Sequence, residues 1–421
     1  MRASVGTPKG WKQIRLKEVI RECNERVGSN NSLPVLSVTN TRGFYQSQEY
    51  FKKQVFSRDI ANYKLVRKGE FAYNPSRVNV GSIDLLETYE QGALSPMYVV
   101  FSTDKNRLIP KYLKYWTQTE RFNSLVKLNT QGSVRDSLNF SSLGSFPFLE
   151  PPVKEQRKIA AILGSVDDAI EASRAVIEQL KVVKKGLMEK LLTCGIDKNG
   201  KIRDPKKQPH LFKQTKLGPI QKEWEVKPLG ELCLAKPEYG ANVSAKDYVE
   251  GLPRYVRITD IDDAGNLMND DKKSISKEDA KHYLLSPGDI IFARSGATVG
   301  KTYMYLPEDG ECAYAGYLIR FRLNQSKLLT RFLFHVTKSS IYNAWVRDML
   351  RAGAQPNINA KEYSSYNVQR PPLEEQKRII ATLDGLSSWI KLETEIEKHF
   401  EKVKSGLMQV LLTGEKRVKI T

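Results

Sequence analysis

One block of this sequence occurs twice, and the repeat limits what the chain can fold into. Residues 151–163 read PPVKEQRKIAAIL and residues 371–383 read PPLEEQKRIIATL. The stretch VKKGLMEKLLT at residues 183–193 recurs at the same displacement as VKSGLMQVLLT at residues 403–413. Because one displacement serves both blocks, the segments between them have equal length. We therefore expect two helices of one fixed length, which act as a spacer between other parts of the chain.

The two expected helices share one pattern of apolar residues. The spacings alternate between three and four, which is typical of a coiled coil, and about forty residues give a rod of roughly 60 Å. We predict an antiparallel pair with a pseudo-twofold axis near the polar layer of Ser173 and Glu393, because each globular part then lies at its own end. The predicted interface residues are Ile159, Val166, Val176, Leu180, Leu187, Ile379, Leu386, Ile396, Phe400 and Leu407.

Two glycines interrupt the helices at equivalent positions, Gly186 and Gly406. Inside a helix, each costs about 1 kcal/mol relative to alanine. Close approach of a neighbouring backbone would offset that cost, and fraying of the helix is the other explanation. Both remain open at this point.

The segments before the helices are rich in expected strands and resemble each other weakly. Lys68–Asn74 and Pro287–Ala293 each place a glycine turn before a β-rich run, and each reaches a second glycine, Gly81 or Gly300. The fold class we predict is α+β, with two duplicated mixed domains separated by the two helices. The predicted parts are a first domain at 1–150, a helix at 151–194, a linker at 195–222, a second domain at 223–370, a helix at 371–414 and a basic tail at 415–421.

The charge of the chain favours nucleic acid as a partner. Its 421 residues include 67 Lys and Arg against 48 Asp and Glu, which leaves a formal charge of +19. Such a surface attracts polyanions. The sequence has no apolar run of membrane-spanning length and no signal-peptide pattern at its start, so we expect a cytoplasmic protein. The spacing of its four cysteines and four histidines predicts neither a disulfide framework nor a metal site.

One loop resembles a phosphate-binding motif. The stretch from Ser295 to Thr302 misses the Gly-x-x-x-x-Gly-Lys-Ser/Thr pattern by one residue, because Ser295 stands in place of the first glycine. The equivalent stretch of the first half keeps Gly81 but lacks the Lys-Thr pair. A strand-loop-strand turn that faces DNA is the better explanation. We find no catalytic constellation and expect no active site in this chain.

Polar residues gather in turn-rich parts of both expected domains. Arg reads guanine edges, Asn and Gln read adenine, and Lys contacts phosphate, although any one of them is equally well explained as a solvated surface side chain. The DNA-binding candidates of the first domain are Arg42, Lys53, Arg58, Tyr73, Asn74, Arg77, Asn79, Gln131 and Arg135. Those of the second are Tyr239, Arg254, Arg257, Arg294, Ser295, Thr298, Lys301, Arg351 and Gln355.

Several of these motifs resemble the specificity subunits of type I restriction-modification systems. They are the Pro-Pro-x-x-Glu-Gln blocks, the Gly-Leu-Met-x-x-Leu-Leu-Thr blocks, the entry to the second half at residues 217–224 and the stretch Gly69–Arg77. The resemblance covers essentially the whole chain.

The resemblance implies two target-recognition domains that each read half of a bipartite double-stranded DNA site, with the helix pair as spacer. It further implies two methyltransferase (modification) subunits and motor-nuclease (restriction) subunits as partners. These partners, and not this chain, would bind S-adenosylmethionine, ATP and Mg. A stand-alone or architectural DNA-binding protein is the alternative, and an ATP-using enzyme at residues 295–302 is a third, weaker one.

Overall fold

The computed structural model describes residues 7–29, 32–40, 43–47, 59–130, 137–215, 218–351 and 356–420. The chain divides into two compact units, unit 1 with Met1–Arg174 and Thr394–Thr421, and unit 2 with Ala175–Glu393. Two long helices, α5 (Val153–Cys194) and α10 (Leu373–Leu411), therefore each begin in one unit and end in the other. The division falls beside Ser173 and at Glu393, the level of the predicted polar layer.

Unit 1 contains a four-stranded antiparallel sheet with the order β2-β9-β6-β7 and three smaller strand pairs. The pairs are β1 with β10, β3 with β4, and β5 with β8. The strands are β1 (Lys12–Arg15), β2 (Ile20–Cys23), β3 (Leu36–Thr39), β4 (Gly43–Gln46), β5 (Lys64–Arg67), β6 (Phe71–Tyr73), β7 (Ile83–Leu85), β8 (Gln91–Leu94), β9 (Val99–Thr103) and β10 (Pro147–Glu150).

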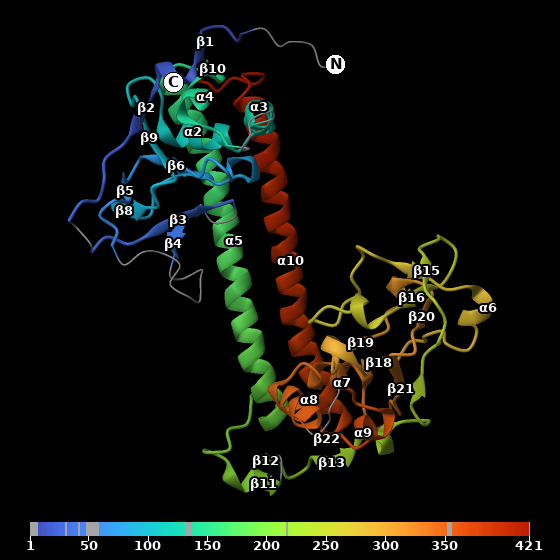
Figure 1. The fold of residues 1–421 in the computed structure, drawn as a ribbon. Helices are drawn as coiled ribbons and strands as arrows, with labels where there is room; N and C mark the ends of the chain where they lie inside the picture. The colour runs from blue at the N-terminus through green and yellow to red at the C-terminus, as the bar shows by residue number, and fades with distance from the viewer. Residues whose placement is uncertain are drawn as a thin grey trace. The chain divides into compact units, whose positions relative to one another are not determined.

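Within the described residues, unit 1 also has the short helices α2 (Pro110–Thr117), α3 (Glu120–Thr130) and α4 (Phe140–Gly144). Their aromatic residues pack on those of the sheet, and the resulting core also takes in Ile159 from the start of α5 and Leu411 from the end of α10. Within this unit the two long helices therefore run in opposite directions through one shared core (Figure 1).

Unit 2 repeats this plan with additions. Its four-stranded antiparallel sheet has the order β14-β21-β18-β19, and β13 pairs with β22 as β1 pairs with β10. In a second sheet, β15-β17-β16-β20, the parallel pairing of Tyr255 with Ala313 corresponds to that of Val35 with Ala93 in unit 1, whereas the hairpin β11-β12 lies outside that plan. The strands are β11 (Phe212–Thr215), β12 (Gly218–Gln221), β13 (Glu225–Pro228), β14 (Glu238–Tyr239), β15 (Lys246–Asp247), β16 (Arg254–Val256), β17 (Lys273–Ser274), β18 (Asp289–Ala293), β19 (Thr302–Met304), β20 (Cys312–Tyr314), β21 (Leu318–Arg322) and β22 (Asn367–Arg370).

The helices of unit 2 are α6 (Lys277–Ala280), α7 (Thr330–Val336), α8 (Ser340–Arg351) and α9 (Ala360–Ser364). Its largest core joins the sheet and α7 to Leu191 from the end of α5 and Ile379 from the start of α10. The hairpin β11-β12 lies in the segment predicted as a linker, so that segment is folded and not merely extended.

The Glu-Gln pair of the repeated block has one role in both units. In unit 1 the buried Glu155 carboxylate accepts a hydrogen bond from Trp11 Nε1 (3.0 Å) and pairs with Arg417 (2.7 Å). In unit 2 the Glu375 carboxylate accepts from Trp224 Nε1 (3.2 Å) and pairs with Arg203. We call each set a Trp-Glu-Arg cluster.

The glutamine that follows the glutamate forms hydrogen bonds with the backbone just before a short helix of the same unit, α2 in unit 1 and α7 in unit 2. Gln156 accepts from the amide of Ile109 (2.8 Å) and donates to the carbonyl of Arg107 (2.7 Å). Gln376 accepts from the amide of Leu329 (2.9 Å) and donates to the carbonyl of Lys327 (3.1 Å). Buried amides left without partners are costly, so these contacts explain why both copies of the block have this glutamine.

The predicted helix interface is partly wrong. Ile159 and Ile379 are buried, and Val166, Leu180, Leu187, Leu386, Phe400 and Leu407 are half-buried. Val176 and Ile396 are instead 41% and 36% exposed, while Ile170, Ser173 and Ile177 are buried. A straight α-helix drifts by about 20° per heptad against a strict seven-residue repeat, which moves the buried position from Val176 to Ile177.

Neither explanation of the helix glycines is supported. Both helices continue well past Gly186 and Gly406, so there is no fraying at these positions. An added Cβ at either glycine would meet nothing within 4 Å among the described parts of the chain, so no backbone lies close to them.

The predicted α+β class agrees with the mixed helices and sheets of both units. Over the described ranges, no helix is long and apolar enough to cross a membrane. The same ranges contain no group of three or more His, Cys, Asp or Glu side chains arranged to hold a metal ion.

Candidate nucleic-acid interface

The same type of loop follows one inner strand in each unit, β6 in unit 1 and β18 in unit 2. In unit 1, β6 leads through a 3-10 turn at Val78–Val80 to β7, its antiparallel neighbour. In unit 2, β18 leads through a turn at Gly296–Thr298 to β19 in the same way. Both turns are followed closely by a glycine in the left-handed region, Gly81 (φ +90°) and Gly300 (φ +89°). These strand-loop-strand turns carry most of the predicted DNA-binding residues that the structure describes.

The loop of unit 1 presents three predicted residues. Arg77 and Asn79 are exposed, and Arg77 has no ion pair or side-chain hydrogen bond among the described residues. Asn74 is half-buried, and its Oδ1 accepts from the amide of Ser76 (3.0 Å), which fixes the start of the turn. A free guanidinium on a fixed turn suits contact with a phosphate or a base edge.

Tyr73 is corrected. Its side chain is 0% exposed and packs edge-on against Phe101 in the core of unit 1. Burial also raises the pKa of its hydroxyl far above the usual value. A side chain enclosed in this way cannot contact DNA. Successive side chains of a strand point to opposite faces of the sheet, and the position of Tyr73 in β6 directs its side chain into the core.

A hollow of about 400 Å³ beside this loop adds residues that the sequence did not single out. It is lined by Asn40, Asn79, Val80, Gly81, Asn123 and Lys127. Amides and one lysine, without any carboxylate, suit a nucleic-acid surface. Asn123 and Lys127 lie one turn apart on α3, but a polar helix face of this kind has no distinctive sequence signal.

A larger hollow of about 860 Å³ in unit 1 is less suited to DNA. Its basic residues are already neutralised: Lys114 pairs with Asp84 and Glu87, and Lys404 pairs with Asp167. Arg174 likewise binds glutamates on both long helices within this unit. Lysines and arginines held by carboxylates offer little net attraction to phosphate.

The loop of unit 2 presents Arg294 on top of Tyr239. The guanidinium lies 4.8 Å from the ring centroid, and its Nε donates to Asn357 Oδ1 (3.3 Å). Tyr239 is 41% exposed, and its hydroxyl accepts from the amide of Ala360 (3.1 Å). Ser295 is half-buried and forms a backbone bridge with Asn357.

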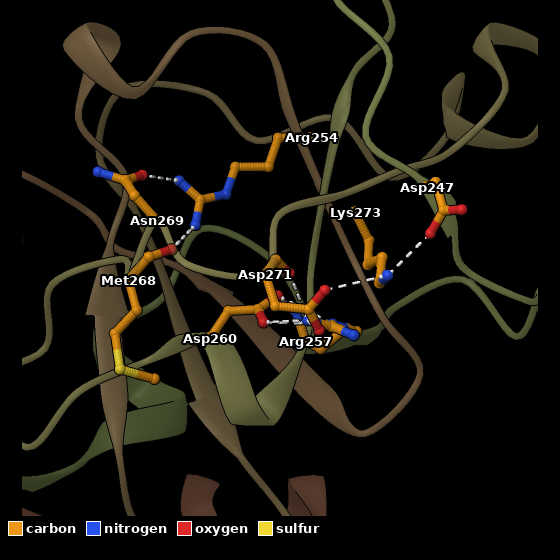
Figure 2. Close-up of polar contacts among 8 residues, drawn as sticks. All are labelled: Asp247, Arg254, Arg257, Asp260, Met268, Asn269, Asp271 and Lys273. Carbon is orange, nitrogen blue, oxygen red and sulfur yellow. Dashed lines mark hydrogen bonds and ion pairs between the residues drawn. The ribbon is translucent and has the colours of Figure 1, made fainter. Parts of the chain in front are cut away.

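Arg254 and Arg257 have other roles, as Figure 2 shows. Arg254 is 6% exposed and donates to Asn269 Oδ1 (3.2 Å) and to the Met268 carbonyl. Arg257 pairs with Asp260 (2.6 Å) and Asp271 (3.1 Å), and the bond to Asp260 raises its pKa. The prediction of DNA contact is therefore corrected for Arg254, which is buried, while Arg257 is largely occupied by carboxylates.

The phosphate-loop resemblance has no structural counterpart. The loop at residues 295–302 leads into β19 and not into a helix, so it lacks the helix N-terminus that a nucleotide-binding loop places at the phosphates. Lys301 donates to the carbonyl of Ile261 (3.3 Å) and pairs with Asp263 (2.8 Å), and Thr298 Oγ1 is buried. The remaining candidates, Arg42, Lys53, Arg58, Gln131, Arg135, Gln355 and the side chain of Arg351, lie outside what the structure describes.

Comparison with protein families gives two matches along this chain. Residues 8–182 and residues 221–402 each match the model described as "Type I restriction modification DNA specificity domain". Each match covers one strand-rich segment and most of the helix that follows it.

Two relatives come from Methanocaldococcus jannaschii. The MjaVIII type I restriction enzyme specificity subunit is 24% identical, over 98% of this chain and 94% of its own length. The putative MjaX specificity subunit is 26% identical, over 88% and 83%. The solved type I restriction-modification S subunit from M. genitalium is 12% identical with a TM-score of 0.57, over 100% of this chain and 99% of its own, which shows a shared fold.

Proposed function

Because the chain belongs to the type I restriction modification DNA specificity domain family, we propose that its two units each read one half of a bipartite DNA site. The protein is the DNA-specificity subunit of a type I restriction-modification system and is not itself the catalytic part. It binds DNA and assembles with other subunits of that system. The single observation that carries the proposal is the double family match, one for each strand-rich half.

The strand orders support two duplicated target-recognition domains. Both units have a four-stranded antiparallel sheet, a loop after its central strand, and a Trp-Glu-Arg cluster. The side chains on the two loops differ, as expected if the two half-sites differ. Arg77, Asn79 and Arg294 are the described residues best placed to contact DNA.

The helices α5 and α10 are proposed to form an antiparallel spacer. In unit 1 the start of α5 shares a core with the end of α10, and in unit 2 the start of α10 shares a core with the end of α5. Two continuous helices that meet in both units in this way support an antiparallel pair. Their length then sets the number of unread base pairs between the half-sites.

Partner subunits are proposed to supply the chemistry. Two methyltransferase subunits would bind S-adenosylmethionine and methylate adenine, and motor-nuclease subunits would use ATP and Mg. The loop at residues 295–302, which resembles a phosphate-binding motif, is poorly suited to bind ATP. Lys301 pairs with Asp263, and a strand follows the loop where a nucleotide-binding loop has a helix. A stand-alone DNA-binding protein is the less favoured alternative, because the relatives are subunits of restriction enzymes.

Domain exchange tests the proposal. We would replace Met1–Arg174 together with Thr394–Thr421 by the corresponding unit of a relative, assemble the complex, and map methylated adenines across a genome. One half of the recognised sequence should change while the other half and the spacer stay. Changes in both halves would contradict separate reading by the two units.

Exchanging residues 1–150 alone is the informative control. That segment contains Trp11 but not Glu155, Arg417 or Leu411, which complete its core and its Trp-Glu-Arg cluster. We expect this shorter exchange to fold less stably than the exchange of the whole unit.

A further inference from the structure

Arg294, Tyr239 and Asn357 form one constellation on the surface of unit 2. Tyr239 lies beneath the guanidinium of Arg294, at 4.8 Å, and Asn357 accepts from its Nε at 3.3 Å. Among the described residues no carboxylate pairs with Arg294, and no acceptor binds either of its Nη nitrogens. A stacked and tethered guanidinium loses little further entropy on binding, so its two free Nη groups are arranged in advance for an acceptor pair.

The groups that hold Arg294 are themselves fixed. Tyr239 belongs to the two-residue strand β14, whose Glu238 pairs with the buried Arg320 of β21. The Tyr239 hydroxyl accepts from the amide of Ala360 (3.1 Å). The Arg294 carbonyl accepts from the amide of Ile358 (2.8 Å), next to Asn357. All three side chains therefore rest on backbone that the fold of unit 2 holds in place.

The equivalent backbone of unit 1, which we call the shared frame, carries different side chains. There the carbonyl of Pro75 accepts from the amide of Leu138 (3.0 Å), as the carbonyl of Arg294 accepts from Ile358. Proline thus stands at the position of Arg294, and Ser137 stands at the position of Asn357. The frame is shared while the arginine and its amide partner are replaced together. That is the pattern expected of side chains that distinguish one half-site from the other.

We propose that Arg294, stacked on Tyr239 and oriented by Asn357, reads a guanine in the half-site bound by unit 2. The two Nη groups donate to guanine O6 and N7, the acceptor pair that only guanine presents in the major groove. Tyr239 and Asn357 are positioning residues that hold the guanidinium plane. A phosphate contact is the competing role for a surface arginine, but a phosphate does not require a guanidinium fixed in one plane. The inference rests on the function proposed above and goes beyond it by naming a base and the residue that reads it.

The experiment uses the assembled complex of this chain with its methyltransferase partners. The recognised sequence is first determined for the wild type by mapping methylated adenines. Binding is then measured on duplexes in which each guanine of the unit 2 half-site is replaced, one at a time, by 7-deazaguanine, which lacks the N7 acceptor. The wild type should lose about 5–150-fold in affinity at one guanine. Arg294→Ala should bind about as weakly and should no longer distinguish guanine from 7-deazaguanine there.

Three further variants separate base reading from other roles. Arg294→Lys keeps the charge but not the planar fork, so a phosphate contact would survive in it, whereas guanine discrimination should fall. Tyr239→Ala and Asn357→Ala should weaken discrimination at the same guanine, while Tyr239→Phe, which keeps the ring, should largely retain it. Thermal unfolding checks that each variant is folded.

Two outcomes overturn the inference while leaving the proposed function intact. One is an unchanged guanine preference in Arg294→Ala, or a wild-type half-site without a sensitive guanine. The other is a uniform loss across all sequences that Arg294→Lys restores, which would assign Arg294 to a phosphate. If the wild type instead recognised no bipartite sequence, the proposed function itself would fail.

Discussion

The indole nitrogen of Trp11 donates a 3.0 Å hydrogen bond to the buried carboxylate of Glu155. Arg417, which follows the end of α10, completes this cluster in unit 1. The cluster therefore joins the beginning of the chain, the start of α5 and the end of the chain. Trp224, Glu375 and Arg203 form its counterpart in unit 2.

Removing the arginine should destabilise unit 2 more than unit 1. Both carboxylates are buried, with Glu375 3% and Glu155 0% exposed as side chains, but Arg203 is 15% exposed and Arg417 is 39% exposed, so water screens the Arg417 pair better. Arg203→Ala should cost about 3–5 kcal/mol of unfolding free energy, because it leaves a buried carboxylate unpaired. Arg417→Ala should cost less, because water can reach Glu155 through the space that the half-exposed guanidinium leaves. Urea unfolding measures both losses of stability. If both were below about 0.5 kcal/mol, the two ion pairs would contribute no more than exposed surface pairs do, and the prediction would be wrong.

Unit 2 should lose stability in mild acid through His335. Burial lowers the pKa of His335 below 6.5, against the opposing effect of Asp384. The unfolded chain then binds a proton that the folded chain does not, so the unfolding free energy falls as the pH drops below about 6.5. His335→Gln should flatten this decline between pH 7 and pH 5, as urea midpoints would show. Replacement of the exposed His282 by Gln is the control and should leave the decline unchanged.

Asp384 adds a second step at lower pH. Burial alone would raise its pKa, but hydrogen bonds from His335 and Arg331 outweigh that effect and hold the pKa at about 2. Its contribution is complete above about pH 4 and is lost as the pH falls towards 2. Asp384→Asn should remove this step, and a step of unchanged size would assign it to other carboxylates.

The helix glycines can be replaced with a gain in stability. Gly186→Ala and Gly406→Ala should each stabilise the isolated chain by about 0.5–1 kcal/mol, because the new Cβ has free space and alanine favours the helix. Gly195→Ala is the contrasting control, since Gly195 has φ +70° and its Cβ would lie 2.2 Å from Glu375 Oε1. A stabilised chain that assembles less well with its partners would show that a partner approaches the helix at the glycine.

Lys301→Ala should leave ATP binding by the isolated chain at zero. Lys301 is engaged by Asp263 and the Ile261 carbonyl, and β19 follows its loop. Isothermal titration of ATP into both proteins checks this. Saturable binding that the substitution abolishes would contradict our interpretation of the loop.

The sequence predicted the parts of this fold that repeat. The two long helices and the glycine turns at Gly81 and Gly300 are predictable because each pattern occurs in both halves of the chain, so that either copy supports the other. Local patterns did not show that unit 1 takes its core from both ends of the chain, since Leu411 and Trp11 are far apart in sequence. A strict heptad pattern predicts that Val176 is buried, but a straight α-helix drifts from the period of 3.5 residues on which that pattern depends.

The candidate site was predicted less well than the fold. Residue type alone cannot distinguish an arginine that faces solvent, such as Arg77, from one that satisfies internal acceptors, such as Arg254. The stacking of Arg294 on Tyr239 joins the loop after β18 to strand β14, which is distant in sequence, so only the structure shows it.

The central claim is that two helices of fixed length set the distance between two half-sites. Its most direct test inserts one heptad into both α5 and α10, beside Ser173 and Glu393, and measures binding of the assembled complex to duplexes with graded spacers. Seven residues lengthen a helix by about 10 Å, or about three base pairs. Three base pairs also rotate the second half-site by about 100°, whereas a heptad turns the helix face by only about 20°. The variant should stop binding the original spacer and should bind a spacer about three base pairs longer only weakly. Unchanged binding to the original spacer would contradict the account.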